Sequence, residues 1–289
     1  MIVITGATGH LGQAVVDHLL AHVPADHVVA SVRNTEEAAG LARRGVEIRR
    51  GDFAEPGSLA AAFAGADQAL VVSVDKLGDE ARRLHRNAIE AARAAGARRV
   101  LYTSHMGVRP DSLFAPAADH AVAEAVLAES GGAYTALRHG YYAESALHHL
   151  GQGITNGEIR APEDGPVSWT ARADLAEADA AILADEGRFD GPTPPLTAPE
   201  AYTFADLAAI ASEITGREVK RAVLTDDEWV SERVAQGVPE PLARMLLGSY
   251  QASRRGDFAA VDPTLEALLG RRPLTMRDVL ADVLNPSGA

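Results

Sequence analysis

The sequence of 289 residues contains no cysteine, which excludes disulfides, thiolate nucleophiles, iron–sulfur clusters and cysteine-ligated zinc. Only Lys76 and Lys220 are lysines, so any role that requires a lysine has two candidates. No apolar run approaches the roughly 20 residues of a membrane span. The first apolar run starts at Ile2, which leaves no room for a signal peptide. We therefore expect a cytoplasmic protein that does not bind a membrane.

Positive charge is also scarce, because 40 acidic residues oppose 27 basic ones and the net charge is −13 at pH 7. Nucleic acids and anionic membranes attract basic surfaces, so we expect neither as a partner. An anionic cofactor would have to be held locally. The ten histidines include His18 and His22, four residues apart, but no HExxH motif, and we expect no metal site.

The most informative motif is TGATGHLG, from Thr5 to Gly12, directly after the apolar run 2–4. It predicts a strand, a tight glycine turn and the start of a helix. Glycines at 6, 9 and 12 allow a tight turn, close approach of the backbone to a pyrophosphate and close packing of the helix on its strand. The free N–H groups of the helix would face the phosphates. We expect Gly6, Thr8, Gly9, His10, Leu11 and Gly12 to bind a dinucleotide.

Strand and helix patterns alternate regularly through the first half of the chain. Predicted strands lie at 2–4, 27–32, 46–50, 68–72, 99–103 and 133–137, and predicted helices at 34–44, 57–64, 78–95 and 117–130. This alternation predicts an α/β fold of the Rossmann type, a doubly wound parallel sheet with helices on both faces. We expect a dinucleotide-binding domain over 1–150. A smaller, mostly helical substrate-side subdomain over 151–289 would be interleaved with the sheet. Its predicted helices lie at 173–184, 203–215, 226–236, 241–252, 263–269 and 276–284.

Arg33 ends the second predicted strand, 21 residues after Gly12. In NAD-specific folds an acidic residue near this position binds the ribose hydroxyls, whereas an arginine accommodates a 2′-phosphate. A guanidinium makes charge-assisted, bidentate hydrogen bonds to a phosphate, so Arg33 favours NADPH over NADH. The alternative is a solvated arginine at the end of a strand.

Polar residues follow the next predicted strands, where the rest of the cofactor would lie. Asp52 and Phe53 follow the third strand and are candidates to contact the adenine, although a plain turn and helix cap explains them equally well. Ser73, Tyr102 and Thr103 are candidates for the nicotinamide half of the cofactor.

Many reductases of this fold use a tyrosine as proton donor, with a lysine four residues later that lowers its pKa. The sequence contains no YxxxK motif. Hydride transfer to an electron-poor acceptor is the remaining interpretation, because proximity to the cofactor then supplies most of the catalysis.

The sequence resembles the NmrA-like, atypical short-chain dehydrogenase/reductase family. The likeness is strongest to its branch of type 2 NAD(P)H:quinone oxidoreductases and triphenylmethane reductases. The matching segments are 5–12, 32–34, 95–97, 102–104, 134–138, 170–174 and 268–271. The resemblance implies NADPH in a cleft and reduction of quinones or similar planar acceptors without a tyrosine–lysine pair. It also implies that the glycine-motif residues and Arg33 bind the cofactor.

The sequence departs from this family at three positions. Relatives tend to carry a lysine on the helix after the fifth strand, where this chain has Ala125. His10 replaces the usual glutamine, and His139 replaces the asparagine usual after the sixth strand. His139 is a candidate to supply a proton or bind a substrate oxygen, against the alternative of a hydrogen-bonded structural role.

Ser104, Met106, Tyr141, Tyr142 and Trp169 are candidates to line an aromatic acceptor pocket, against ordinary core packing. The leading hypothesis is an NADPH-dependent reductase that transfers hydride directly to a quinone-like acceptor. The alternatives are a non-catalytic NADP(H)-binding redox sensor and a ketone or imine reductase of secondary metabolism. A homodimer is also compatible with the apolar helices of such folds.

Overall fold

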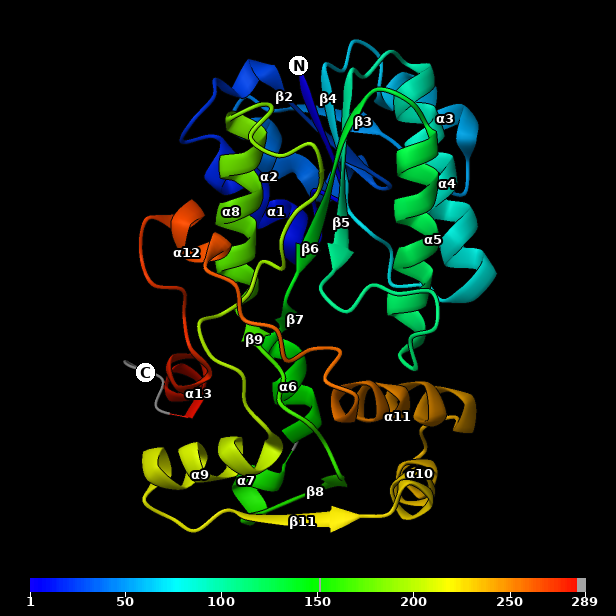
Figure 1. The fold of residues 1–289 in the computed structure, drawn as a ribbon. Coiled ribbons are helices and arrows are strands. Elements are labelled where there is room, and N and C mark those ends of the chain that lie inside the picture. Colours follow the sequence, from blue (N-terminus) through cyan, green and yellow to red (C-terminus); the bar gives the residue numbers. More distant parts are fainter. Residues whose placement is uncertain (151, 285–289) are drawn as a thin grey trace.

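The computed structural model describes residues 1–150 and 152–284 and has a seven-stranded parallel sheet at its centre (Figure 1). The strand order is β10-β6-β5-β4-β1-β2-β3. The strands are β1 Ile2–Thr5, β2 Val28–Val32, β3 Glu47–Arg50, β4 Gln68–Val71, β5 Arg99–His105, β6 Ala133–His139 and β10 Gly191–Pro192. This is the doubly wound arrangement that the alternating pattern predicts, and the predicted fold class is confirmed.

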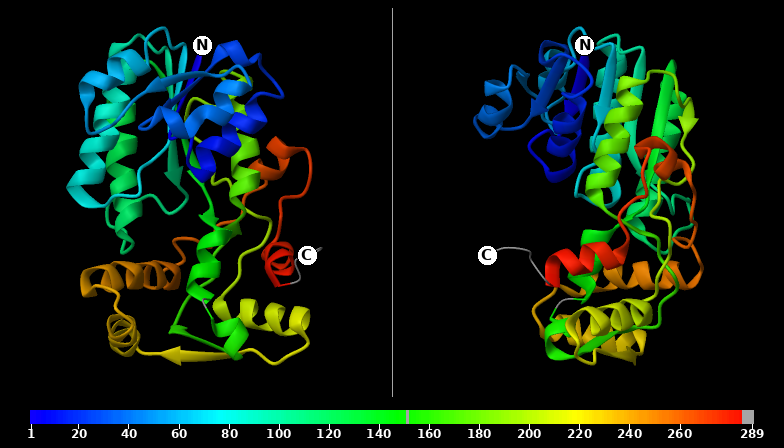
Figure 2. Two further views of the ribbon diagram at one scale, coloured as in Figure 1. Left: turned by 180° about the vertical axis from the view of Figure 1, so that it is seen from behind. Right: turned by 90° about the vertical axis from the view of Figure 1, so that its left-hand side faces the viewer.

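Helices cover both faces of this sheet, so its central strands are apolar on both sides (Figures 1 and 2). Ile2 and Ile4 of β1 pack on one face with α1 and α8, whereas Val3 packs on the other face with α3, α4 and α5. The bounds of these helices are α1 His10–Leu19, α8 Arg172–Ala184, α3 Pro56–Ala62, α4 Gly78–Ala94 and α5 Ala115–Glu129. Two smaller helices, α2 Ala39–Arg43 and α12 Thr264–Leu269, join the α1 face.

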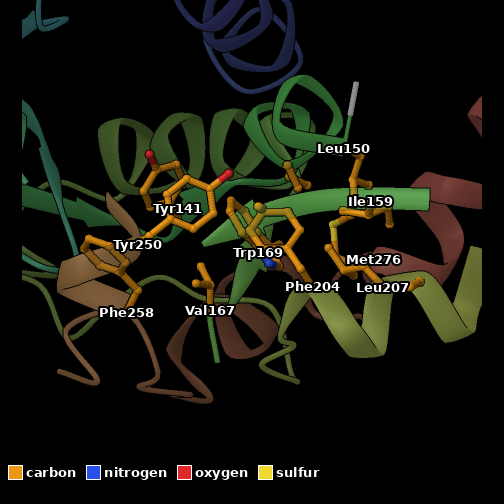
Figure 3. Packing of buried hydrophobic residues seen from close by; sticks show 14 of the residues in the cluster. Tyr141, Leu150, Ile159, Val167, Trp169, Phe204, Leu207, Tyr250, Phe258 and Met276 are labelled. Carbon is orange, nitrogen blue, oxygen red and sulfur yellow. The ribbon is translucent and has the colours of Figure 1, made fainter. Parts of the chain in front are cut away.

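A second unit lies beyond the carboxyl edge of the sheet and has its own buried core (Figures 1 and 3). Its helices are α6 Ala143–Leu150, α7 Gly153–Asn156, α9 Phe204–Thr215, α10 Asp226–Ala235, α11 Glu240–Arg254 and α13 Met276–Leu284. Two parallel strand pairs accompany them: β8 Glu158–Pro162 with β11 Lys220–Leu224, and β7 Tyr141–Tyr142 with β9 Trp169–Thr170. Aromatic side chains such as Tyr141, Trp169 and Phe204 form much of this core.

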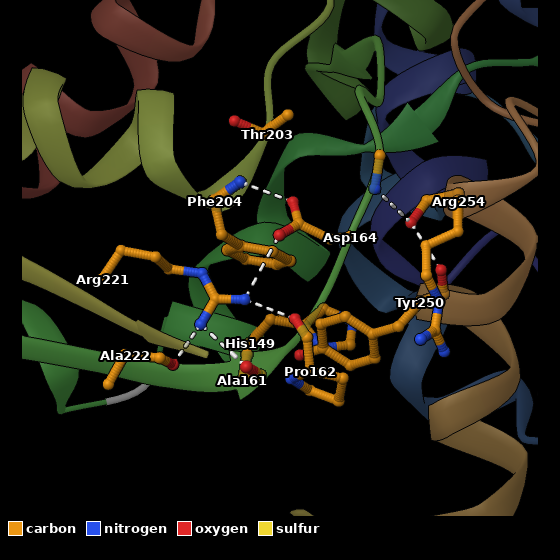
Figure 4. A network of polar contacts seen from close by, with 12 residues as sticks. His149, Ala161, Pro162, Asp164, Thr203, Phe204, Arg221, Ala222, Tyr250 and Arg254 are labelled. Atoms are coloured by element: carbon orange, nitrogen blue, oxygen red, sulfur yellow. Dashed lines mark hydrogen bonds and ion pairs between the residues drawn. The ribbon is translucent and has the colours of Figure 1, made fainter. Parts of the chain in front are cut away.

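A buried ion pair joins the strand pair β8 and β11 to helix α9 (Figure 4). The guanidinium of Arg221 lies 3.2 Å from Asp164 and also donates to the carbonyl oxygens of Ala161 and Pro162. Asp164 accepts in turn from the backbone N–H of Phe204 at 2.7 Å, at the first residue of α9. Both charged side chains are nine-tenths buried, so this pair fixes the second unit internally.

The two units meet at a junction that the chain traverses repeatedly. Gly140, between β6 and β7, donates its N–H to the carbonyl oxygen of Leu196 at 2.8 Å. The hydroxyl of Thr170 accepts from the N–H of Ala198 at 2.9 Å. A Cβ on Gly140 would lie 2.9 Å from the oxygen of Leu196 and closer still to Thr170. Only glycine fits where these three segments cross.

The structure differs locally from the predicted elements. The helix predicted at 34–44 is a 3₁₀ helix, Thr35–Ala38, followed by the short α2, with Gly40 near the change. Asn34 caps it by accepting the N–H of Glu36. Strands β5 and β6 each run two residues further than predicted, because their register continues to the pair His105 and His139. Strands β7, β8, β9, β10 and β11 and helices α6 and α7 were not predicted as elements.

Candidate functional site

The glycine turn between β1 and α1 is built so that no side chain fills it. Gly6 has a φ of +59°, and its carbonyl oxygen accepts the N–H of Gly9 at 2.9 Å. A Cβ on Gly12 would lie 2.8 Å from the Gly6 carbonyl carbon, and one on Gly9 would lie 3.2 Å from its oxygen. The hydroxyl of Thr5 joins this turn to β4 by accepting the N–H of Val72 at 2.9 Å. The three glycines therefore hold a compact backbone cradle.

Helix α1 begins at this cradle, and within the described chain no side chain caps its N-terminus at Gly9. Free N–H groups at a helix N-terminus form a binding site for anions. Thr8, Gly9 and His10 keep exposed surface here, whereas Leu11 and Gly12 are buried and hold the helix on the sheet.

Arg33 lies near the cradle because β1 and β2 are adjacent in the sheet. Their register pairs Thr5 with Ser31, so the turn after β1 and the turn that carries Arg33 leave the sheet at the same edge. The Arg33 side chain is exposed. An exposed guanidinium beside a phosphate cradle suits a 2′-phosphate.

Asp52 and Phe53 follow β3 at the same edge and are partly exposed. One oxygen of the Asp52 carboxylate accepts the N–H of Ala54 at 2.8 Å, which is an ordinary turn contact. The carbonyl oxygen of Phe53 accepts from Asn87 of α4. Asp52 therefore makes an ordinary turn contact through one carboxylate oxygen. A contact of its second oxygen with the adenine stays a prediction.

Ser73, after β4, and Thr103, within β5, lie side by side. The Thr103 hydroxyl accepts the N–H of Ser73 at 2.8 Å and contacts the Ser73 hydroxyl at 3.1 Å. Thr103 is buried, whereas Ser73 is partly exposed. The structure therefore gives Thr103 a supporting position and leaves Ser73 at the edge of the sheet.

The side chain of Tyr102, the third candidate for the nicotinamide half of the cofactor, lies apart from Ser73 and Thr103. Side chains alternate along a strand, so Leu101 packs on the α1 face and Tyr102 on the α4 and α5 face. Its ring has no exposed surface. Burial raises the pKa of its hydroxyl, which contacts ring nitrogens of His85 and His120.

Ser104, expected at the acceptor, also points into the protein. Its hydroxyl donates to Glu124 of α5 at 2.6 Å, and Arg138 of β6 forms an ion pair with the same carboxylate at 2.7 Å. The Ser104 side chain is buried. The structure thus uses it to hold α5 against β5 and β6.

His139 is buried at the end of β6 and paired with a buried carboxylate of α8. Its Nε2 lies 2.9 Å from Asp179, and both side chains have at most 1% exposure. Burial raises the pKa of Asp179. The other ring nitrogen, Nδ1, lies 3.5 Å from the hydroxyl of Tyr142, and Arg172 stacks over the Tyr142 ring. His139 thus lies inside the protein, and Tyr142 is its neighbour on the outer side.

Met106, Tyr141 and Trp169 belong to one buried cluster, the core of the second unit. Figure 3 shows Tyr141 and Trp169 within it. Tyr141 and Trp169 pack edge to face with centroids 5.0 Å apart, and the Met106 sulfur accepts from Ser168. A space of about 10 Å³ remains beside Tyr141 and Trp169, which is room for one water. In this structure the three side chains pack as a core, the alternative weighed from the sequence.

Three histidines form a cluster that the sequence reasoning missed. His85 of α4 and His120 of α5 contact Tyr102, and the ring of His105 of β5 stacks on that of His120. Burial lowers the pKa of His85 to about 4 and that of His105 to about 3, and it lowers that of His120 strongly. The one sequence signal for this cluster was a histidine at the end of a strand, His105.

The described residues include no group of three or more His, Asp or Glu side chains arranged to hold a metal ion. Among the same residues, no helix combines the length and apolarity that a bilayer crossing needs. The features that fit a ligand are the glycine cradle, the uncapped N-terminus of α1 and Arg33, and together they fit a dinucleotide phosphate. The fold and this site define a dinucleotide-binding protein of the Rossmann type.

Comparisons with known proteins agree with this class. Residues 6–186 match a family described as NAD(P)H-binding. Quinone oxidoreductase 2 of Escherichia coli is 34% identical over 288 residues, with 99% of each chain covered. A solved structure of the NADPH-dependent quinone oxidoreductase of E. coli with NADPH has a TM-score of 0.92, covering 99% of this chain and 100% of that chain.

Two further relatives resemble the chain over nearly its full length. The NmrA-like family domain-containing oxidoreductase flvB of Aspergillus flavus is 30% identical, covering 97% of this chain and 94% of that protein. Triphenylmethane reductase of Citrobacter sp., solved with NADP(H), has a TM-score of 0.89 at 33% identity, covering 97% and 99% of the two chains. The chain belongs to the NAD(P)H-binding, NmrA-like family. The predicted family, NAD(P)H cofactor and assignment to the oxidoreductases are confirmed.

Proposed function

We propose that this protein is an NADPH-dependent reductase that passes hydride directly to a quinone or a similar planar, conjugated acceptor. The observation that carries the proposal is the exposed Arg33 beside the glycine cradle, in a chain without a YxxxK motif. Arg33 supports NADPH, and the missing pair disfavours acceptors that need an activated tyrosine. The names of the E. coli and Citrobacter relatives support acceptors of this class.

The residues of the cradle would bind and orient the cofactor. The N–H groups at the start of α1 would face the pyrophosphate, and the guanidinium of Arg33 would hold the 2′-phosphate. Bound NADPH supplies the hydride. The protein then has to place the acceptor over the carboxyl ends of β4, β5 and β6, where proximity supplies much of the rate.

The side chain of His139 is buried and cannot touch the acceptor, so its role in this function is that of a positioning residue. Its contact with Asp179 fixes its ring, and its Nδ1 faces the Tyr142 hydroxyl. We infer that the pair holds Tyr142 against the end of β6. His139→Asn should therefore alter the KM for the acceptor more than kcat.

The decisive experiment measures NADPH oxidation with 1,4-benzoquinone, together with the Kd for NADPH and NADH. We expect turnover far above the rate without protein and tighter binding of NADPH than of NADH. Arg33→Ala should remove that preference, whereas Arg43→Ala, an exposed arginine on α2, should leave it intact. Tight NADPH binding without turnover on quinones or dyes would instead indicate a redox sensor.

A further inference from the structure

Tyr102 joins two histidines into a continuous chain of hydrogen bonds. Its hydroxyl oxygen lies 3.2 Å from Nδ1 of His85 and 2.7 Å from Nδ1 of His120. On the far side of His85, the backbone N–H of Val74 donates to Nε2 at 3.0 Å. The chain therefore runs from the loop after β4, through α4 and β5, to the second turn of α5.

The positions of the protons follow from these contacts. A backbone N–H can only donate, so Nε2 of His85 is an acceptor and its proton is on Nδ1. That Nδ1–H donates to the Tyr102 oxygen, and the single hydroxyl proton of Tyr102 is then directed to Nδ1 of His120. His120 consequently carries its proton on Nε2. Among the described residues this ring nitrogen has no hydrogen-bond partner.

His120 lies at the edge of the sheet where the cofactor cradle opens. Its ring stacks on that of His105, the last residue of β5, with centroids 6.2 Å apart and planes 14° apart. Val74, at the other end of the chain, is two residues from Val72, which contacts Thr5. Unlike Tyr102, the residue His120 keeps part of its surface exposed.

The ring of His120 stays neutral near pH 7. Burial lowers its pKa, and the neighbouring histidines His105, His85 and His139 lower it further. The two carboxylates of α5 nearest to it along the helix are already paired, Asp119 with Arg82 and Glu124 with Arg138. Their negative charge is thus compensated by arginines.

We propose that His120 is a catalytic residue that donates a hydrogen bond from Nε2–H to the carbonyl oxygen of the acceptor, and that Tyr102 and His85 are positioning residues that fix this tautomer. This role rests on the proposed function. The Nε2–H group would stabilise the negative charge that forms on the acceptor oxygen as hydride arrives. A fixed N–H donor at such an oxygen contributes to catalysis because it needs no reorganisation during the reaction.

The row of hydrogen bonds from His85 through Tyr102 to His120 can hold the Nε2–H of His120 as a donor, but it cannot deliver a proton to it. If His120 lost its Nε2 proton, the replacement would have to come from Tyr102 and then from His85. The Nε2 of His85 is occupied by the Val74 N–H, which cannot supply a proton. The proton that completes the reduced product therefore comes from water, while the hydride comes from NADPH.

The tautomers can be measured without turnover, by NMR of the full protein with ¹⁵N-labelled histidine at pH 7.5. We expect His120 as the neutral Nε2–H form and His85 as the neutral Nδ1–H form. Tyr102→Phe should release His120 to a mixture of tautomers. An imidazolium or an Nδ1–H tautomer at His120 in the unchanged protein would overturn the proposal.

Kinetics test whether the donor acts on the acceptor. His120→Leu should lower kcat with 1,4-benzoquinone by about 100-fold, the typical loss of one such donor, without changing the Kd for NADPH. His120→Gln retains an N–H donor and should recover part of the loss. His27→Leu, an exposed histidine at the opposite edge of the sheet, is the matched control. A wild-type kcat in His120→Leu, or His120→Gln no better than a folded His120→Leu, contradicts the proposal.

A last measurement separates this proposal from the proposed function. Hydroquinone added to the labelled protein with NADP⁺ should shift the His120 Nε2 resonance and leave that of His27 unchanged. An unchanged His120 resonance at saturating hydroquinone overturns the contact even if the protein reduces quinones. Absent turnover with a shifted resonance would overturn the proposed function alone.

Discussion

Substituting Gly12 by alanine tests the cradle most directly. An added Cβ would lie 2.8 Å from the carbonyl carbon of Gly6, 3.2 Å from Cα of Ala7 and closer still to the Gly6 oxygen. Ordinary contacts of a Cβ begin near 3.4 Å, and all three neighbours are backbone atoms that cannot rotate away. The start of α1 must therefore move away from the turn by roughly 1 Å, at the ~1–3 kcal/mol typical of overpacking.

This displacement affects the N–H groups that would face the pyrophosphate. If the strain is expressed in binding, the Kd for NADPH should rise by about ten- to a hundredfold, since each 1.4 kcal/mol is roughly tenfold. The part expressed in folding should lower Tm by about 2–4 °C for each kcal/mol. Isothermal titration with NADPH and thermal unfolding of the protein without cofactor measure the two parts.

Gly57 provides the matched control. It lies in α3, and a Cβ there would meet nothing within 4 Å. Gly57→Ala should leave NADPH binding unchanged and raise stability by about 0.5–1 kcal/mol, because alanine favours a helix over glycine. A Gly12→Ala protein with wild-type Kd and Tm would refute the steric reasoning.

Three further predictions concern charge and burial. Arg33→Ala should raise the Kd for NADPH by roughly ten- to a hundredfold and leave that for NADH nearly unchanged, because it removes charge-assisted hydrogen bonds worth ~1.5–3 kcal/mol; equal effects on both cofactors in fluorescence titrations would contradict the assignment. Burial lowers the pKa of His85 from 6.5 to about 4, so the unfolded chain binds a proton that the folded one does not, and the free energy of unfolding should fall by up to ~3 kcal/mol from pH 6.5 to 4. Urea unfolding should show a smaller pH dependence in His85→Asn, and an equal one would refute this origin. Arg221→Met should cost about 3 kcal/mol, since it leaves the carboxylate of Asp164 buried without its cation, and Arg221→Lys should recover part of the loss in the same assay.

The features that were predictable from the sequence are the local ones. The glycine turn and the strand before it occupy a dozen consecutive residues, so their spacing alone indicates the geometry. Arg33 was recognisable as a candidate because its distance from Gly12 along the chain is characteristic of cofactor-binding positions in this fold. Parallel strands buried on both faces likewise appear as continuous apolar runs.

The missed features depend on contacts between distant residues. His139 and Asp179 are 40 residues apart, and the chain from His85 through Tyr102 to His120 spans three elements. The face on which Tyr102 packs was not predictable, because position near the end of a strand does not say which face a side chain takes. Met106, Tyr141 and Trp169 lie in one buried cluster, and only the packing shows how little space remains beside Tyr141 and Trp169.

The junction around Gly140 has a consequence for exchanging parts between relatives. Segments near residues 140, 170 and 196 cross there, so the chain passes between the sheet and the second unit several times. Helix α8 and strand β10 return to the sheet after the second unit has begun. A chimera that took the second unit of a relative as one contiguous cassette would separate β6 from its own β10 and α1 from its own α8. Transplanting acceptor preference between family members therefore requires several short segments, exchanged together with the residues that meet at Gly140.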